Sequence, residues 1–264
     1  MENLHIIKIG GNILDDDKKL QMFLRNLVKI PERKILVHGG GKLASALSSR
    51  LGIEPVMHNG RRITDAETLK IVTMVYAGWL NKSIVAALNS LGAASVGLCG
   101  ADAKLIPSVK RPVGEVDFGF AGDVIYEEVN DRLINDLLCG GLLPVVASIT
   151  ADASGQLLNT NADTIAAALA AALAVRYSVR LIYCFEKKGV LLDVSNDDSV
   201  LNDLDRNRYE ELKSKGVIDR GMIPKLDNAF NALAKGVHRV LIGDADDILL
   251  LTSQKKHEGT LIRN

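Results

Sequence analysis

The stretch Leu4–Asn12, LHIIKIGGN, runs from apolar residues through a pair of glycines toward a segment with helical spacing. Its apolar part predicts a buried strand, and Lys18–Val28 has the periodicity of an amphipathic helix. The same order recurs where a predicted strand at Lys34–Val37 leads through His38–Gly41 (HGGG) to a predicted helix at Leu43–Leu51. Strands that pass through turns into helices indicate an α/β fold.

Strand and helix patterns alternate through the rest of the chain as well. Further strands are predicted at Ala94–Leu98, Leu142–Ala147, Val179–Phe185 and Arg239–Ile242. Further helices are predicted at Ala66–Leu91, Asp131–Cys139, Asp163–Ala174, Arg208–Lys215 and Lys225–Lys235. This alternation predicts an α/β three-layer sandwich with a central, mainly parallel sheet. The segment Lys104–Tyr126 is rich in proline and glycine, and we expect hairpins or a long loop that covers a site.

The composition of the 264 residues limits the classes of protein to which the chain can belong. Apolar residues make up 47% and aromatic residues only 4%, so we expect an aliphatic core of strands covered by helices. Lys and Arg together number 32, as do Asp and Glu, and a neutral chain has no overall attraction for nucleic acid or an anionic membrane. We therefore expect neither as a partner.

Three isolated cysteines, Cys99, Cys139 and Cys184, lack the C-x-x-C spacing of a zinc or redox site. Their odd number favours a reducing compartment over a disulfide framework. The N-terminal residues do not have the pattern of a signal peptide, and the apolar run Ile165–Val175 is too short to span a bilayer. The expected location is the cytoplasm.

The two glycine turns are candidates for binding an anion. Glycine lets backbone N–H groups approach a ligand closely, and a helix N-terminus favours negative charge. Any strand-to-helix turn can use a pair such as Gly10-Gly11, but three consecutive glycines at 39–41 cost backbone entropy, which favours a function. Lys42 follows them without the Ser/Thr of a Walker A loop. We expect His38 to be a hydrogen-bonded core histidine.

Asn159, Asn161 and Asp163 alternate where a loop opens a predicted helix. Ordinary N-capping is one interpretation. A single cap does not need three such residues, so the alternative is that they bind an amino-acid-like ligand and orient lysines. The turn Asn59–Arg62 (NGRR) is likewise either a solvated basic turn or a place where arginine binds a substrate carboxylate.

The order of these motifs resembles that of the amino acid kinase family, and within it the branch that phosphorylates N-acetylglutamate. The matching segments run through nearly the whole chain: Lys8–Asn12, His38–Gly41, Asn59–Asp65, Val96–Gly100, Asn159–Asp163 and Gly221–Lys225. The resemblance implies a central, mainly parallel sheet between helices, in two lobes. Residues 1–175 would bind the acyl amino acid and carry a homodimer contact, and residues 176–264 would bind ATP.

The resemblance also implies roles for single residues. Lys8 and Lys225 would stabilise the transition state, and Asp163 would organise them. The acyl-glutamate or the transferred phosphoryl would contact Gly40, Gly41, Arg61, Arg62, Asn159 and Asn161. The nucleotide would lie against Gly10, Gly11, Glu186, Lys187, Lys188, Gly189, Val190, Leu191, Val217, Ile218 and Asp219. ATP would bring Mg²⁺, held mainly through its phosphates, and no metal site of the chain's own is expected.

The implied reaction, a step of arginine biosynthesis, makes the acyl phosphate of an acyl-glutamate. It needs no general base, because a glutamate-type carboxyl with a pKa of about 4.3 is already ionised at pH 7. The difficulty is to bring two anions together. Phosphoryl transfer then depends on positioning and on neutralising charge, for which lysines and glycine N–H groups are suited.

Departures from the family pattern leave alternatives open. Phe185, Lys187 and Lys188 stand where a Thr/Ser-Asp-Val-x-Gly-Val pattern is usual, which leaves the nucleotide preference open. Arg61 replaces a common leucine; it either points to solvent or pairs with the extra carboxylate of a succinyl group. A carrier-linked aminoadipate kinase and a non-catalytic sensor of amino acid or nucleotide are further alternatives. Because the first strand begins near Leu4, without the N-terminal helix of arginine-inhibited members, we expect a dimer that arginine does not strongly inhibit.

Overall fold

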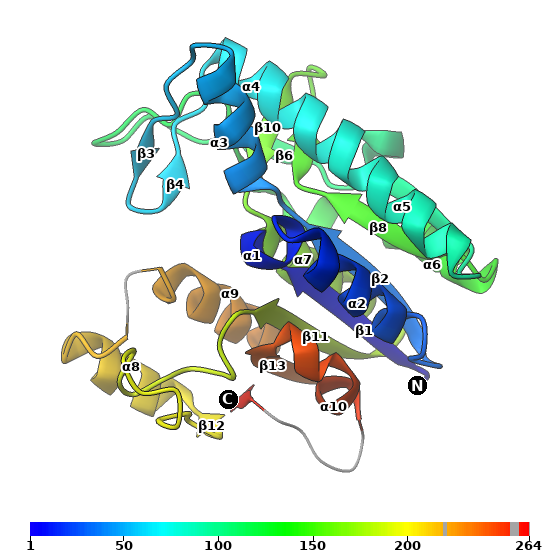
Figure 1. Ribbon diagram of the computed structural model, residues 1–264, viewed down its shortest axis with the longest axis vertical. Coiled ribbons are helices and arrows are strands. Elements are labelled where there is room, and N and C mark those ends of the chain that lie inside the picture. Colours follow the sequence, from blue (N-terminus) through cyan, green and yellow to red (C-terminus); the bar gives the residue numbers. More distant parts are fainter. Residues whose placement is uncertain (219–220, 254–258, 264) are drawn as a thin grey trace.

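A computed structural model describes residues 1–218, 221–253 and 259–263. Its centre is an eight-stranded sheet with the strand order β12-β14-β13-β11-β1-β2-β8-β5 (Figure 1). All neighbouring strands in it are parallel except β13 and β14. The strands span Asn3–Ile9 (β1), Arg33–His38 (β2), Ser95–Cys99 (β5), Leu143–Ala147 (β8), Ser178–Phe185 (β11), Asp203–Leu204 (β12), Arg239–Asp244 (β13) and Thr260–Ile262 (β14). The predicted mainly parallel sheet is confirmed.

Helices cover both faces of this sheet, which confirms the three-layer sandwich. One core lies under α2, α5 and α10, and the other lies under α6, α7, α8 and α9. These helices span Asp17–Leu27 (α2), Asn81–Ser90 (α5), Asp131–Cys139 (α6), Ala162–Leu173 (α7), Arg206–Ser214 (α8), Ile223–Ala234 (α9) and Ile248–Thr252 (α10). The remaining α-helices are Gly11–Leu14 (α1), Gly41–Arg50 (α3) and Ala66–Thr73 (α4).

The alternation of side chains along β1 determines where Lys8 points. Leu4 and Ile6 belong to the core under α7, whereas Ile7 and Ile9 belong to the core under α2. Successive side chains of a strand face opposite sides of the sheet, so Lys8 shares the α7 side with Leu4 and Ile6. Its partner in the register of β11 is Tyr183.

A smaller four-stranded sheet has the order β6-β7-β10-β9, and its strand β9 begins just after the carboxyl end of β8. Its strands are Ser108–Lys110 (β6), Ala121–Val124 (β7), Ile149–Ala151 (β9) and Leu157–Thr160 (β10). The antiparallel pair β6 and β7 confirms a hairpin within Lys104–Tyr126. A second hairpin joins Met57–His58 (β3) to Arg61–Arg62 (β4), and in Figure 1 it lies across from the start of α9.

One continuous helical run, Ala66–Ser90, contains a π-helical segment at Met74–Leu80 between α4 and α5. By length and composition alone the run is apolar enough to cross a membrane. Its apolar side chains at Val72, Tyr76 and Ile84 are buried in cores of this fold. Within the fold, 44% of the most apolar part of the run is buried.

The predicted boundary near residue 175 falls between α7 and β11. Strand β11 pairs with β1 from Ser178 to Cys184, so the central sheet continues across this boundary. The assignment of residues 1–175 and 176–264 to two lobes stays a prediction. The sequence analysis did not foresee several short elements: α1, α10, β3, β4, β9, β10, β12 and β14.

Candidate active site

Two lysines from distant parts of the chain contact one carboxylate. Lys8 Nζ lies 2.8 Å from Asp163 Oδ1, and Lys225 Nζ lies 2.9 Å from Asp163 Oδ2. Lys8 is on β1, Asp163 is in the first turn of α7 and Lys225 is in the first turn of α9. All three side chains are largely buried. The structure therefore brings together the three residues for which the sequence analysis expected catalytic roles.

The charges in this cluster oppose the effect of burial. Burial by itself would raise the pKa of Asp163, but the charges of Lys225 and Lys8 outweigh it and hold that pKa well below its usual range. Burial lowers the pKa of Lys225, while Asp163 acts in the opposite direction. When all three groups are ionised the cluster carries net positive charge, which suits it to stabilise an anion.

Aromatic rings hold the Lys225 ammonium in place. Its Nζ lies 5.1 Å from the ring centre of Tyr183 and 5.8 Å from that of Phe185. Tyr183 Oη also donates a hydrogen bond of 3.1 Å to the carbonyl oxygen of Asp163. Tyr183 therefore contacts both the lysine and the turn that carries its carboxylate partner. Phe185, which departs from the usual family pattern, contributes a cation–π contact to Lys225.

The first glycine turn lies against the lysine cluster. A Cβ added to Gly10 would stand 3.9 Å from Lys8 Nζ. Lys42, next to the second glycine turn, donates a hydrogen bond to Asn12 Oδ1 and lies 3.5 Å from Asp15 Oδ2. Lys42 thereby ties the two glycine turns together.

The second glycine turn contains a position that only glycine fits. Gly40 has φ 150°, in the region that side chains avoid. A Cβ there would approach Leu80 Cδ1 to 2.4 Å and Tyr76 Cδ1 to 2.9 Å. Both neighbours belong to the π-helical segment. The backbone of the turn therefore packs directly on that segment.

A cavity of about 310 Å³ opens beside this turn. It is lined by residues of both glycine-rich and Asn-rich motifs, among them Gly39, Gly40, Gly41, Arg61, Arg62, Tyr76, Gly122, Ser148, Asn159, Asn161 and Asn228. Arg62 is buried and its Nη2 donates to Gly41 O at 2.8 Å and to Ser45 Oγ at 2.7 Å. Its Nη1 has no hydrogen-bond partner within the described residues. That nitrogen is itself enclosed by protein, so the Arg62 guanidinium as a whole adds positive charge to the wall of this cavity.

Two of the asparagines that line this cavity, Asn159 and Asn161, have different local contacts. Asn159 Nδ2 donates to Thr64 Oγ1 at 2.9 Å. Asn161 Oδ1 caps α7, accepting from the N–H groups of Asp163 at 2.7 Å and Thr164 at 3.2 Å. The capping interpretation is therefore correct for Asn161. Contact of either side chain with a substrate stays a prediction.

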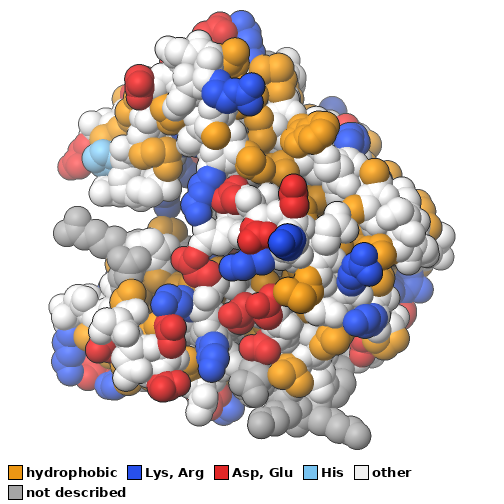
Figure 2. Space-filling model, viewed as in Figure 1, with side chains coloured by type: hydrophobic (Ala, Val, Ile, Leu, Met, Phe, Trp, Pro, Cys, Tyr) orange, Lys and Arg blue, Asp and Glu red, His pale blue; other side chains and the backbone are white. Residues whose placement is uncertain are grey.

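A second cavity, of about 590 Å³, adjoins the first and shares Arg61, Arg111 and Pro224 with it. Arg111 pairs with Asp123, the shortest nitrogen-to-oxygen distance being 2.5 Å. Arg61 is exposed, and its side chain makes no hydrogen bond or ion pair with the described residues. Figure 2, drawn from the same direction as Figure 1, shows Lys, Arg, Asp and Glu side chains gathered across the middle of the molecule.

A smaller, mainly apolar pocket of about 160 Å³ contains most of the residues predicted to contact the nucleotide. Its lining residues are Phe185, Glu186, Lys187, Gly189, Val190, Leu191, Val194, Ile218 and Met222. The predicted Lys188 and Val217 are not among them: Lys188 is exposed, and Val217 packs against the core. The predicted Asp219 lies outside the described residues.

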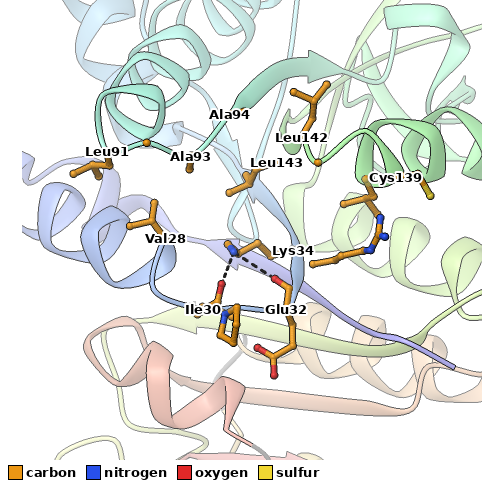
Figure 3. A pocket seen from close by; sticks show the side chains of 15 residues that line it. Val28, Ile30, Glu32, Lys34, Leu91, Ala93, Ala94, Cys139, Leu142 and Leu143 are labelled. Atoms are coloured by element: carbon orange, nitrogen blue, oxygen red, sulfur yellow. Dashed lines mark hydrogen bonds between the residues drawn. The ribbon is translucent and has the colours of Figure 1, made fainter.

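A larger cavity, of about 660 Å³, is remote from these groups. It lies at the amino ends of β2, β5 and β8, where Lys34 Nζ donates to the carbonyl oxygens of Ile30 and Glu32 (Figure 3). The lysine cluster lies at the opposite end, near the carboxyl end of β1. Because ligands of open parallel sheets bind at the carboxyl ends, the smaller cavities are the candidate site.

Several residues of the site escaped the sequence analysis. Tyr76, Ser148 and Asn228 line the first cavity, and Tyr183 supports the lysine cluster. None of them belongs to a local motif in the sequence. Asn228 lies three residues after Lys225, on the same side of α9, so helical spacing from a predicted site lysine was the one usable signal.

Comparisons with known proteins give a consistent picture. The family model described as "Amino acid kinase family" matches residues 3–244. An acetylglutamate kinase of Cytophaga hutchinsonii is 52% identical over 261 residues, with 98% of each chain covered. An acetylglutamate kinase of Parabacteroides distasonis is 52% identical over 248 residues, covering 94% of this chain and 96% of the relative. A solved structure, smu.665 of Streptococcus mutans, has a TM-score of 0.79 at 28% identity and covers 98% of both chains.

Proposed function

This chain belongs to the amino acid kinase family, and we propose that it transfers the γ-phosphoryl group of ATP to the γ-carboxylate of N-acetyl-L-glutamate. The products are N-acetyl-γ-glutamyl phosphate and ADP, and the reaction is a step of arginine biosynthesis. The convergence of Lys8 and Lys225 on Asp163, beside a cavity that Arg62 lines, carries the proposal. Identity near 50% to acetylglutamate kinases over nearly the full chain supports the choice of acceptor.

The acyl-glutamate is proposed to occupy the cavity of about 310 Å³. Arg62 would attract a carboxylate of the substrate, while two hydrogen bonds from Nη2 keep its guanidinium fixed. Asn159 and Asn161 would contact the polar amide end of the substrate. The γ-carboxylate would then face Gly40 and Gly41, whose N–H groups stand at the start of α3.

The nucleotide is proposed to lie with its base in the apolar pocket around Val190, Leu191 and Ile218. Its phosphates would extend to Gly10 and Gly11, next to Lys8. Attack of a carboxylate oxygen on the γ-phosphorus forms the new P–O bond, and the bond to the β-γ bridging oxygen breaks with ADP leaving. Lys8 and Lys225 would neutralise the charge on the moving phosphoryl oxygens.

Mg²⁺ is proposed to enter with ATP. In the described part of the chain no group of three or more His, Cys, Asp and Glu side chains could hold a metal ion. The one carboxylate in the lysine cluster, Asp163, already binds two ammonium groups. Phosphate oxygens are the common Mg²⁺ ligands in kinases, where the ion neutralises phosphate charge.

We also propose that the protein is a homodimer in the cytoplasm, and that each chain has two lobes, at residues 1–175 and 176–264.

A second candidate acceptor is N-succinyl-L-glutamate, which carries one more carboxylate. Arg61 favours it, because this exposed guanidinium has no partner in the described structure and lines both adjoining cavities. Arg111 adds a second guanidinium at the same place, although Asp123 neutralises it. A longer acidic acyl group would reach this pair.

A hydroxamate assay of acyl phosphate formation tests both acceptors. The purified chain is incubated with ATP, Mg²⁺ and, in parallel, N-acetylglutamate, N-succinylglutamate or free glutamate. The proposal requires an acyl phosphate from an acyl-glutamate and little from glutamate. The acceptor with the higher kcat/KM identifies the acyl group. Formation of no acyl phosphate from either acyl-glutamate would overturn the proposed function.

A further inference from the structure

A buried polar chain connects the second glycine turn to the start of α5. His38, the last residue of β2, and Asn81, the first residue of α5, are both fully enclosed. Asn81 Nδ2 lies 3.1 Å from His38 Nε2 and also donates to Val145 O at 2.9 Å. On the other side of the ring, His38 Nδ1 lies 2.9 Å from the carbonyl oxygen of Gly39.

The partners of His38 determine its protonation state. A carbonyl oxygen can only accept, so the proton is on Nδ1 and is donated to Gly39 O. Nε2 is then unprotonated and accepts from the amide of Asn81. Asn81 Oδ1 in turn accepts from Lys82 Nζ at 3.1 Å, which accounts for the whole amide group. The pattern fits a neutral imidazole, in agreement with burial, which lowers the pKa of His38 to about 4.

This bond orients the next peptide unit of the glycine turn. In a planar trans peptide the C=O of Gly39 and the N–H of Gly40 point in opposite directions. Because His38 holds the carbonyl on its own side, the Gly40 N–H is directed away from the ring. A flipped peptide would instead turn an acceptor oxygen toward the place proposed for an anion.

The other side of the turn is supported by the π-helical segment. Leu80 and Tyr76 fill the space beside Gly40, and Asn81 follows Leu80 directly. One short stretch of chain therefore contacts both the backbone of Gly40 and the ring of His38. Gly97 leaves room for this arrangement, since a Cβ there would come within 1.9 Å of Asn81 Oδ1.

We infer that His38 and Asn81 are positioning residues: Asn81 maintains the Nδ1–H tautomer of His38, and His38 fixes the Gly39–Gly40 peptide so that the Gly40 N–H can donate to the transferred phosphoryl. The inference rests on the proposed function, because it needs an anion beside Gly40. Neither side chain contacts a substrate. Their effect is on the geometry of one backbone donor, which counts most in the transition state.

Two replacements of His38 separate this role from general support of the core. In His38→Asn the amide nitrogen takes the place of Nδ1 and can still donate to Gly39 O. In His38→Gln the longer side chain reaches toward Asn81 and leaves Gly39 O without its donor. We expect His38→Gln to lower kcat at least 100-fold, with KM for ATP and acyl-glutamate within about threefold of wild type. His38→Asn should regain at least a tenth of the wild-type kcat.

Ile84→Ala serves as the matched control for lost stability. Ile84 is fully buried on α5, one turn after Asn81, and packs in the core away from the glycine turn. We expect it to lower Tm and leave kcat at 25 °C unchanged. If His38→Gln keeps the wild-type kcat, or if His38→Asn loses as much as His38→Gln, the inference is wrong. An equal loss of kcat in Ile84→Ala would also overturn it.

A measurement on the wild-type chain needs no folded variant. Nitrogen-15 NMR of the imidazole groups should find His38 with a protonated Nδ1 and an unprotonated Nε2 from pH 6 to pH 8. The opposite tautomer, or an imidazolium in that range, would overturn the inference even if the enzyme is active. Absence of acyl phosphate formation by wild type would instead overturn the proposed function, and leave the tautomer assignment intact.

Discussion

Lys8 and Lys225 contact opposite oxygens of the Asp163 carboxylate, at 2.8 Å and 2.9 Å. Three separate segments, β1, α7 and α9, supply the three groups. Two positive charges are thus kept close together by one negative charge between them. The arrangement keeps both lysines ready for the phosphoryl group, which would otherwise have to draw them together against their repulsion.

Replacing Asp163 by asparagine should damage both activity and stability. The two ammonium groups would remain buried near each other without their counter-charge, and breaking such a buried pair costs about 3–5 kcal/mol. We expect kcat to fall at least 100-fold and the free energy of unfolding in urea to fall by several kcal/mol. Asp131→Asn is the control, since Asp131 pairs with Arg176 near the surface, where the loss is expected to stay below about 1 kcal/mol. Wild-type activity in Asp163→Asn would contradict the proposed site.

Truncating either lysine should lower kcat while the chain stays folded. Lys8→Ala and Lys225→Ala each remove one charge from the transferred phosphoryl, a loss on the order of 100- to 1,000-fold in kcat. Lys70→Ala, which removes only an exposed contact with Glu67 on α4, should leave the rate unchanged. Steady-state kinetics and circular dichroism of the three variants check this. Unchanged phosphoryl transfer in both site variants would show that the lysines are assigned wrongly.

Arg61→Leu tests the acyl group. If Arg61 pairs with the carboxylate of a succinyl group, the variant should lose about tenfold in kcat/KM for N-succinylglutamate, equivalent to roughly 1.4 kcal/mol. The value for N-acetylglutamate should change less than twofold. If Arg61→Leu changes kcat/KM for the two acceptors by the same factor, the side chain only points to solvent.

Gly40→Ala should inactivate the enzyme. The added methyl group would collide with Leu80 and Tyr76, and the backbone conformation at φ 150° is strained for alanine. Gly78 offers a matched control on the π-helical segment, because it is exposed and a Cβ there meets nothing within 4 Å. Gly78→Ala should keep its activity and change the unfolding free energy by less than about 1 kcal/mol. Thermal melts and the hydroxamate assay distinguish the pair.

Stability should decrease between pH 6.5 and pH 4 because of two buried histidines. Burial lowers the pKa of both His5 and His38 to about 4. Well above pH 6.5 each is neutral in the folded and unfolded states and contributes no pH dependence. As the pH falls toward 4, the unfolded chain binds a proton that the folded chain does not, which costs the fold up to roughly 3 kcal/mol per histidine.

His5→Leu provides the test of this pH dependence. The ring nitrogens of His5 have no hydrogen-bond partner among the described residues, and Glu32 is 3.7 Å away. Removing the ring should therefore make the urea unfolding free energy fall less between pH 7 and pH 4.5. His238→Leu, at an exposed position, should leave the slope unchanged. The prediction is wrong if the slopes of wild type and His5→Leu coincide.

Periodicity in the sequence was sufficient for the central layers. Leu4–Ile9 and Val179–Phe185 are long apolar runs bounded by turn residues, and their strands appear within a residue of the expected bounds. Two-residue strands such as β3 and β4 are too short to have a pattern. The π-helical segment keeps the apolar spacing of its neighbours and differs from them only in its hydrogen bonds, so no local signal marks it.

By itself the sequence determined the alternation of strands and helices, the position of the glycine turn at 39–41, and the presence of two lysines and one aspartate in characteristic motifs. These features depend on residues that are close together in the chain, so their spacing can be read from the sequence. Only the tertiary structure decided that Lys8 and Lys225 share Asp163, that Arg62 lines a cavity, and that Asn81 holds His38. Each of these contacts joins residues far apart in the chain, and its geometry follows from strand register and helix packing.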